Sequence, residues 1–293
     1  MTQADTLEKI MANESRAYSN TLMNAPSSPR VICVTSGKGG VGKTNVATNL
    51  AYFLAVTGKK VLILDADLNL ANIDVLLGLS PRYNINHVLK GEKHLQEIIV
   101  QGPGGISILP ASSGIMELAT MTEKQKLFFL SEMETIGQTL DYLIIDTAAG
   151  INDNVVYFNL TAQERIIVLT PEPTSLTDAY ALIKVLASRH GVKRFRVLVN
   201  QATTDKEGKS VFRKLSDVAD RFLDTISLDF LGFVPSDKHL PKAVRQQRLV
   251  SDIYPDSPSG RSFARLSEDI SGETPEYSSD GNIKFFWKGI VDL

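Results

Sequence analysis

The chain has 293 residues, a hydrophobic fraction of 43%, a charged fraction of 22% and a formal net charge of −2, as expected for one large globular domain with extensions. The near-neutral charge gives no reason to expect a specific nucleic-acid partner, although it leaves a local basic patch open. Cys33 is the single cysteine, which excludes an internal disulfide and a cysteine-held iron–sulfur or zinc centre. Without a run of about 18 apolar residues or a signal peptide, we expect a cytoplasmic protein that does not span a membrane.

The chain divides into four predicted parts. Residues 1–30 contain a possible short helix over 1–12 and a polar linker, and residues 271–282 form a second linker before a distinct tail, 283–293. Residues 31–270 alternate apolar runs with helical stretches, which predicts βαβ units and an α/β fold with a mainly parallel sheet covered by helices on both faces. The expected strands are 31–35, 61–64, 106–109, 142–145, 165–169, 196–199 and 230–234.

The segment that follows the first expected strand fits the phosphate-binding pattern G-x-x-x-x-G-K-[ST]. It consists of Gly37, Lys38, Gly39, Gly40, Val41, Gly42, Lys43 and Thr44. A strand before it and a helix after it, over 45–56, are the context that this motif requires and that an incidental glycine-rich turn would lack. Its backbone N–H groups and Asn45, at the helix N-terminus, are predicted to bind phosphates. We expect Lys43 at the β- and γ-phosphates and Thr44 on Mg²⁺, so the predicted cofactors are ATP and Mg²⁺ and the fold is of the P-loop NTPase type.

Carboxylates follow two other apolar strands. Asp65 and Asp67 come after 61–64, and Asp146 comes after 142–145. Such groups are costly to bury unless they serve a charge or a metal, and open α/β sheets bind ligands at the carboxyl ends of their strands. Asp146 and Asp65 are therefore predicted to support Mg²⁺. Asp67 lies beyond the strand, in a position to orient the attacking water, and the family resemblance described in the next paragraph implies that role. Helix capping or turn formation is the alternative for Asp65 and Asp67.

Lys38 is unusual, because an ordinary P-loop has no lysine at this position. With it the loop resembles the deviant Walker A motif of the family that contains MinD, ParA and the nitrogenase iron protein. The resemblance implies that Lys38 reaches the nucleotide of a second subunit, giving an ATP-sandwich homodimer in which Lys38, Lys43 and Asp67 serve slow, switch-like ATP hydrolysis. A solvated loop lysine is the alternative.

The nucleobase is expected at loops later in the sheet. Asn200 ends the strand 196–199, and its amide can donate and accept at once, as an adenine edge requires. The segment Phe233, Val234, Pro235, Ser236 and Asp237 ends the last strand and is predicted to supply backbone and ring contacts. The family resemblance supports both placements, with a simple turn role as the alternative for Asn200.

Longer segments identify the branch. Residues 67–118, 146–151, 171–186 and 242–250 are similar to the FlhG family, also called FleN or YlxH, which controls flagellar number and placement. By motif position, the resemblance puts Asn72 and Asp74 near the dimer interface. It puts Asp178 in a partner-binding segment, where we expect it to open a helix; stabilising that helix N-terminus is the alternative role.

The resemblance also implies partners for both ends of the chain. Residues 3–7 match the middle of a motif with which FlhG proteins stimulate the signal-recognition-type GTPase FlhF. Thr2 and Glu8 depart from that motif, which puts stimulation of the GTPase in doubt. The alternatives are a helix that docks on the partner without stimulating it and an inert tail. A flagellar transcription activator is a second suspected partner.

The tail carries one apolar helical face. It consists of Ile283, Phe286, Trp287, Ile290 and Val291, with Lys284 and Lys288 off that face. Such a helix suits a membrane interface, and two copies in a dimer gain avidity, so we expect peripheral attachment to the cytoplasmic face of the inner membrane with ATP bound. A helix packed onto the domain or onto the other subunit is the alternative.

Two other functions compete with this switch. A ParA-like partition ATPase on DNA needs a basic surface, for which Lys193-Arg194-Phe195-Arg196 and the group Lys242, Arg245 and Arg248 are the sources. A non-enzymatic regulator would use ATP only as a structural ligand while it binds the transcription activator.

Overall fold

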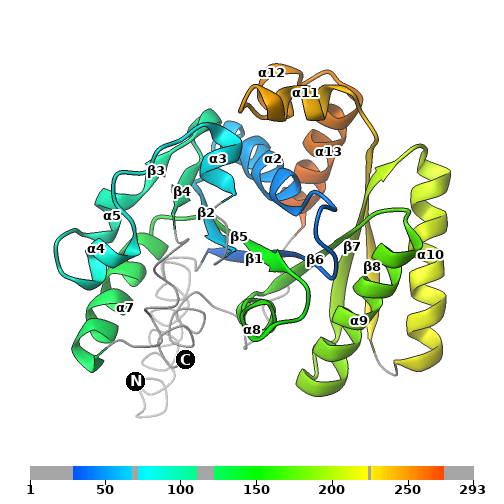
Figure 1. Ribbon diagram of the computed structural model, residues 1–293, viewed down its shortest axis with the longest axis horizontal. Coiled ribbons are helices and arrows are strands. Elements are labelled where there is room, and N and C mark those ends of the chain that lie inside the picture. Colours follow the sequence, from blue (N-terminus) through cyan, green and yellow to red (C-terminus); the bar gives the residue numbers. More distant parts are fainter. Residues whose placement is uncertain (1–28, 68–71, 111–121, 224–225, 274–293) are drawn as a thin grey trace, which may run out of the picture.

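The computed structural model describes residues 29–67, 72–110, 122–223 and 226–273 (Figure 1). The predicted N-terminal helix, the linker from residue 274 onward and the tail 283–293 lie outside the described residues, so their roles stay predictions. No helix of the described part is long and apolar enough to cross a membrane.

One sheet of eight described strands forms the centre of the fold. In spatial order it runs β3 (Val100–Gln101), β4 (Ser107–Leu109), β2 (Val61–Ala66), β5 (Tyr142–Ala149), β1 (Arg30–Ser36), β6 (Glu164–Leu169), β7 (Arg194–Ala202) and β8 (Ser227–Pro235). All neighbouring pairs are parallel except β3 with β4. The seven expected strands are confirmed, and most are longer than predicted. The antiparallel β3 was missed because two residues carry no readable alternation.

Helices cover both faces of this sheet, as expected for parallel strands buried on both sides. One face packs against α2 (Lys43–Val56), α3 (Ile73–Leu77), α11 (His239–Arg245), α12 (Val250–Ile253) and α13 (Pro258–Gly272). The other packs against α4 (Ile85–Leu89), α5 (Leu95–Ile98), α7 (Glu123–Gly137), α8 (Asp153–Thr161), α9 (Pro173–His190) and α10 (Asp205–Phe222). The side chains of β1 show the pleat, because Ile32 and Val34 join the first core while Val31 and Cys33 join the second.

The strand register brings the predicted acidic residues together. Asp65 of β2 is paired with Asp146 of β5, and Asp146 is also paired with Val34 of β1, shortly before the P-loop begins. Three strands that are distant in sequence therefore deliver their carboxyl ends to one edge of the sheet. This edge is where an open α/β sheet places its ligand.

Candidate nucleotide site

The P-loop joins β1 to α2 in the strand–loop–helix arrangement that the sequence predicted. Gly40 and Gly42 have φ angles of 78° and 90°, a region that residues with a side chain rarely adopt. Gly42 is the N-cap of α2, so the loop delivers the chain directly into a helix N-terminus with its free N–H groups and positive dipole end. This geometry suits a bound phosphate.

Asn200, at the end of β7, lies directly beneath the loop. It is only 3% exposed, and its Nδ2 donates to the Val41 carbonyl oxygen at 2.7 Å while its Oδ1 accepts from the Gln201 N–H at 2.9 Å. A Cβ at Gly42 would overlap Nδ2 of Asn200, so this glycine is required for space as well as for backbone angle. The structure thus gives Asn200 a role in holding the P-loop, and its contact with adenine stays a prediction.

The start of the loop packs against α9. A Cβ at Gly37 would overlap the backbone carbonyl of Asp178, so only glycine permits this approach. We expected Asp178 to open the helix, and this prediction is wrong, because α9 begins five residues earlier, at Pro173. Proline is favoured in the first helical turn, where a missing N–H costs nothing. The contact makes the P-loop and the predicted partner-binding helix rigid neighbours.

Lys38 is held by the first turn of α9 and the residue before it. Its Nζ forms an ion pair with Glu172, the N-cap of α9, and donates to Thr174 Oγ1 at 2.9 Å. The Lys38 carbonyl oxygen accepts from Ser36 Oγ at 2.7 Å, which fixes the backbone below. The side chain is 35% exposed. It therefore lies at the surface beside the loop, and both contacts must break before it can reach a second subunit.

Asp146 has the character of a metal-supporting carboxylate. It is fully buried, yet neither carboxylate oxygen has a hydrogen-bond partner among the described residues. Burial raises its pKa to about 7, against the lowering effects of the Lys43 cation and Thr44. An orphaned buried carboxylate beside a P-loop lysine and threonine fits the predicted Mg²⁺ site.

The protein alone offers no complete cage for that ion. No group of three or more His, Cys, Asp or Glu side chains gathers into a metal site in the part of the chain that is described. Mg²⁺ would therefore depend on nucleotide phosphates and retained water, with Thr44 and Asp146 as its protein support, as is usual at phosphate sites.

Asp65 organises the loop that carries Asp67. Its Oδ2 accepts from the N–H groups of Asn72 and Ile73 at 3.0 and 3.1 Å, and its Oδ1 accepts from Asp67 N–H at 3.2 Å. Burial raises its pKa to about 6, and these backbone hydrogen bonds oppose the rise. Asp67 Oδ2 in turn accepts from Asn72 Nδ2 at 3.2 Å. The magnesium-supporting role of Asp65 and the water-orienting role of Asp67 stay predictions. The structure adds that N–H groups on both sides of this segment donate to the Asp65 carboxylate.

The segment expected near the base is mostly engaged in packing. Phe233 packs beside Gly208 of α10, and Val234 is buried in the opposite core, which leaves chiefly their backbone groups and Pro235 for a ligand. Although burial raises the pKa of Asp237, hydrogen bonds from His239 and Ser259 hold it well below its usual value. Asp237 therefore links the end of β8 to the start of α13.

The state of Asp146 gives a prediction for stability. A carboxyl group whose pKa rises from 3.8 unfolded to about 7 folded stabilises the fold below pH 4 relative to higher pH, and this contribution is lost as the pH rises through about 7. The free energy of unfolding, measured with urea in chelator and without nucleotide, should fall in the unmodified chain as the pH rises from 5 to 8. We expect the fall to be about 2 kcal/mol smaller in Asp146→Asn. Asp220→Asn, at an exposed position of α10, is the control. Equal pH dependence in all three proteins would contradict the assignment.

The fold and the P-loop define a P-loop nucleoside-triphosphate-binding protein. A family model described as "ParA: NUBPL iron-transfer P-loop NTPase" matches residues 28–271. The chain belongs to the ParA/MinD family of P-loop NTPases, whose members are ATPases. Iron transfer does not follow for this chain, because Cys33 is its single cysteine and lies buried in β1.

Two curated relatives narrow the branch. The chain is 45% identical over 262 residues to the antiactivator FleN of Pseudomonas aeruginosa, covering 89% of this chain and 93% of that protein. It is 34% identical over 267 residues to the flagellum site-determining protein YlxH of Helicobacter pylori, covering 90% and 88%. The similarity to the FlhG, FleN and YlxH group is thereby confirmed.

Solved structures confirm the fold. A chain of the MinC:MinD cell division protein complex of Aquifex aeolicus is 27% identical to this chain, with a TM-score of 0.66, and the match covers 86% of this chain and 100% of that one. The predicted α/β fold of the P-loop NTPase type is therefore correct.

Proposed function

We propose that this protein is an ATP-dependent dimerising switch that sets flagellar number and placement. The observation that carries the proposal is Lys38, a lysine inside the P-loop that lies at the surface and is paired with Glu172 and Thr174. A cation at this position can serve the nucleotide of a second copy. The similarity to FleN and YlxH supports the flagellar role.

Exposed apolar side chains around the site support a self-association surface. Val75 on α3 is 64% exposed, and Ile151, two residues beyond the carboxyl end of β5, is 46% exposed. Asn72 and Asp74, the predicted interface residues, flank the start of α3. A two-fold dimer uses the same surface of both subunits, so each subunit buries its own set of these apolar side chains in the interface.

Slow hydrolysis follows from this arrangement. Phosphoryl transfer mainly requires positioning and charge neutralisation. In this proposal Lys43 neutralises the phosphates of its own nucleotide, Asp67 orients the water, and Lys38 of a second copy completes the positive charge. An isolated subunit lacks the second lysine, so hydrolysis waits for dimerisation, and loss of the γ-phosphate then weakens the dimer.

The partners and the location of the switch are part of the proposal. ATP-bound dimers are proposed to attach peripherally to the cytoplasmic face of the inner membrane through the tail, whose apolar face is read from sequence. The GTPase FlhF, through residues 1–12, and a flagellar transcription activator are the proposed protein partners. Phosphate release measured with vesicles and a partner present separates a hydrolysing switch from a regulator that only binds ATP.

DNA partitioning is less well supported by the placement of the basic residues. Phe195 is buried, and Arg196 is paired with Glu164 at 3.2 Å and Glu273 at 2.8 Å, so the run 193–196 is not one exposed basic strip. Arg248, which lies three residues beyond the end of α11, is paired with Asp252. These pairs reduce the charge that a phosphate backbone would meet.

The central test is the oligomeric state. We expect sedimentation velocity of the full chain to give a dimer with Mg²⁺ and a non-hydrolysable ATP analogue, and a monomer with Mg²⁺ and ADP. The reason is that the γ-phosphate supplies the charge shared by the two lysines. A monomer in saturating analogue, with binding of the analogue demonstrated in the same sample, would refute the switch.

A further inference from the structure

Gln247, in the segment between α11 and α12, has a backbone conformation that its side chain disfavours. Its φ angle is 53°, and Gln201 is the one other non-glycine residue with a positive φ among the residues that the structure describes. The left-handed region crowds the Cβ atom of every residue except glycine, and glutamine is not among the residues enriched there. Such a conformation persists only where contacts elsewhere enforce it, and it points to a functional role.

The side chain of Gln247 reaches α3. Its Nε2 donates to the Val75 carbonyl oxygen at 2.9 Å, across 172 positions of sequence. A Cβ at Gly78, the C-cap of α3, would lie 3.2 Å from Oε1 and 3.3 Å from Cβ of Gln247, so the side chain rests against this turn. The helices α3, α11 and α12 lie on the same face of the sheet (Figure 1). Gln247 therefore ties the α11–α12 segment to the carboxyl end of α3.

The end of α3 does not need this contact in order to form. Gly78 adopts the left-handed conformation with a φ of 62°, and its own N–H donates to the Val75 carbonyl oxygen at 3.3 Å. The helix is thus already closed by a glycine cap. Gln247 is exposed, and a hydrogen bond that competes with water adds little net stability. Helix capping and fold stability therefore leave the strained backbone of Gln247 unexplained.

The other end of α3 is joined to the candidate catalytic loop. The Asp65 carboxylate accepts from the N–H groups of Asn72 and Ile73 on the side of the helix. The same carboxylate accepts from the Asp67 N–H at 3.2 Å, and Asn72 Nδ2 donates to Asp67 Oδ2 at 3.2 Å. Because α3 and Asp67 share these hydrogen bonds, a shift of the helix moves the side chain that is proposed to orient the water.

The segment that carries Gln247 is itself fixed to the core. Leu249 and Val250, which follow it, are buried. The Ser251 N–H donates at 3.1 Å to Asn49 Oδ1 of α2, the helix that begins at the P-loop. The position of Gln247 is therefore set by the helix that also carries the nucleotide site.

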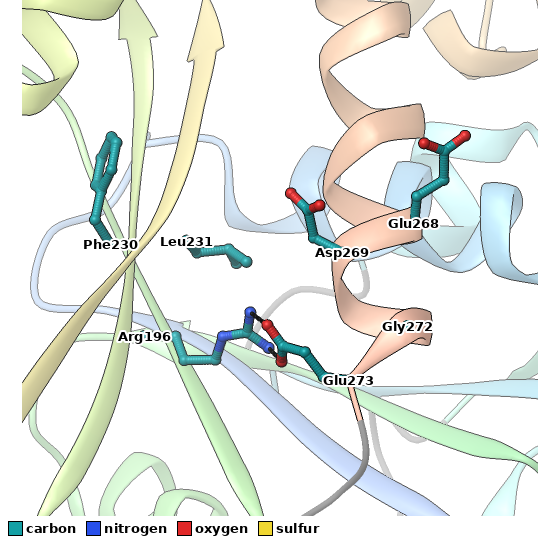
Figure 2. A pocket seen from close by; sticks show the side chains of 7 residues that line it. All are labelled: Arg196, Phe230, Leu231, Glu268, Asp269, Gly272 and Glu273. Carbon is teal, nitrogen blue, oxygen red and sulfur yellow. Dashed lines mark hydrogen bonds and ion pairs between the residues drawn. The ribbon is translucent and has the colours of Figure 1, made fainter.

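The helix α13, which packs against α12, is held at both ends. At its start, Ser259 Oγ donates at 2.7 Å to Asp237, which follows β8. After its end, at the amino ends of the strands, Glu273 pairs with Arg196 at 2.8 Å and lies 3.6 Å from the Arg30 guanidinium. Figure 2 shows Glu273 turned toward Arg196 at the foot of α13. These contacts make α12 and α13 a fixed support from which Gln247 constrains α3.

We propose that Gln247 is a positioning residue for ATP hydrolysis and acts on Asp67 through α3. The inference rests on the proposed water-orienting role of Asp67 and adds the residue that keeps this group in place. The strained backbone of Gln247 aims a donor at the carboxyl end of α3. Val75, whose carbonyl oxygen receives that donor, belongs to the proposed dimer surface, so the same hydrogen bond also sets the helix that meets a second copy.

The test compares steady-state ATP hydrolysis, with Mg²⁺, by the full chain and three variants. Gln247→Glu keeps the side-chain length but its carboxylate cannot donate, Gln247→Asn keeps the amide but is one methylene short, and Gln247→Gly removes the strain together with the side chain. We expect kcat to fall about tenfold in each, with the KM for ATP within about twofold, because a displaced positioning group slows the chemistry without touching the nucleotide contacts. Gln96→Glu and Gln96→Asn, at an exposed position of α5, are the matched controls and should behave like the unmodified chain.

Stability and hydrogen exchange separate positioning from a structural role. Gln247→Gly should have a urea unfolding midpoint equal to or above that of the unmodified chain, because glycine accepts the left-handed backbone. With Mg²⁺ and a non-hydrolysable ATP analogue bound, amide exchange of a peptide covering 73–79 should be about threefold faster in each variant, the factor that one weak hydrogen bond supplies. A peptide from α13 should exchange equally in all forms. A variant that is less active but no less stable is not expected if Gln247 serves only the fold.

Different results separate this inference from the proposed function. Unchanged kcat in all three Gln247 variants would refute the inference, even with faster exchange over 73–79. Loss of kcat that follows a lowered urea midpoint in every variant, Gln247→Gly included, would leave only a structural role and overturn it as well. The switch fails on another result, a monomer in saturating analogue, and the kcat and exchange measurements then still decide the role of Gln247. An unmodified chain that binds ATP but releases no phosphate, even with vesicles and a partner present, would overturn the inference and leave dimerisation to be judged by sedimentation.

Discussion

Lys38→Ala is expected to abolish ATP-driven dimerisation while ATP binding stays within a few-fold of normal. Each dimer contains two copies of the lysine, and a hydrogen bond to a charged group contributes about 1.5–3 kcal/mol, so the dimer dissociation constant should rise at least 100-fold. Binding to the subunit's own nucleotide persists because Lys43 and the loop N–H groups remain in place.

The measurement is sedimentation velocity with Mg²⁺ and the ATP analogue, alongside a fluorescent-nucleotide titration. Lys59→Ala, an exposed lysine after α2, removes the same charge elsewhere and should dimerise normally. A Lys38→Ala protein that dimerises like the control would show that the lysine is only a surface partner of Glu172, and the sandwich would have to be abandoned.

Asp67→Ala is expected to slow ATP hydrolysis about 100-fold and to leave ATP binding intact, because a misplaced water loses roughly that much in rate. The dimer should then persist in ordinary ATP, since the γ-phosphate that holds it is no longer removed. The fold should tolerate the change, because Asp65 receives the Asn72, Ile73 and residue-67 N–H groups through backbone contacts.

Phosphate release and sedimentation in ATP test this pair of effects together. Asp220→Ala, exposed on α10, is the control for the loss of a carboxylate. Slow hydrolysis with rapid return to monomers would separate the two effects and would place Asp67 in dimer assembly rather than in positioning water. Unchanged hydrolysis would remove Asp67 from the catalytic group altogether.

Local patterns predicted seven of the eight described strands and the correct loop. Buried parallel strands read as continuous apolar runs, and the P-loop residues occupy a single short segment between a strand and a helix. The meeting of Asp65 with Asp146 could also be predicted, because parallel strands align their carboxyl ends. These features depend on neighbours in sequence or on one rule of sheet geometry.

The side-chain contacts that the sequence did not predict share a physical cause. The contact of Lys38 with Glu172 joins residues 134 positions apart, and Asn200 reaches Val41 across 159 positions. The error at α9 was of a different kind. Asp178 was expected to open the helix, but α9 begins at Pro173, since proline is favoured in the first helical turn. Side-chain partners of this type depend on which strands become neighbours in the sheet, and the order of strands is not written in any local pattern.

The sequence by itself therefore determined the class of fold, the phosphate-binding loop and the presence of a second lysine within it, because backbone conformation and apolar periodicity are local properties. The tertiary structure alone decided that Gly37 rests on α9, that Lys38 is held by Glu172, and that Glu273, the last described residue, lies at the end of the sheet opposite the nucleotide site. Those facts arise from close packing between elements that are distant in the chain, where van der Waals contact and charge pairing act only after the sheet has assembled.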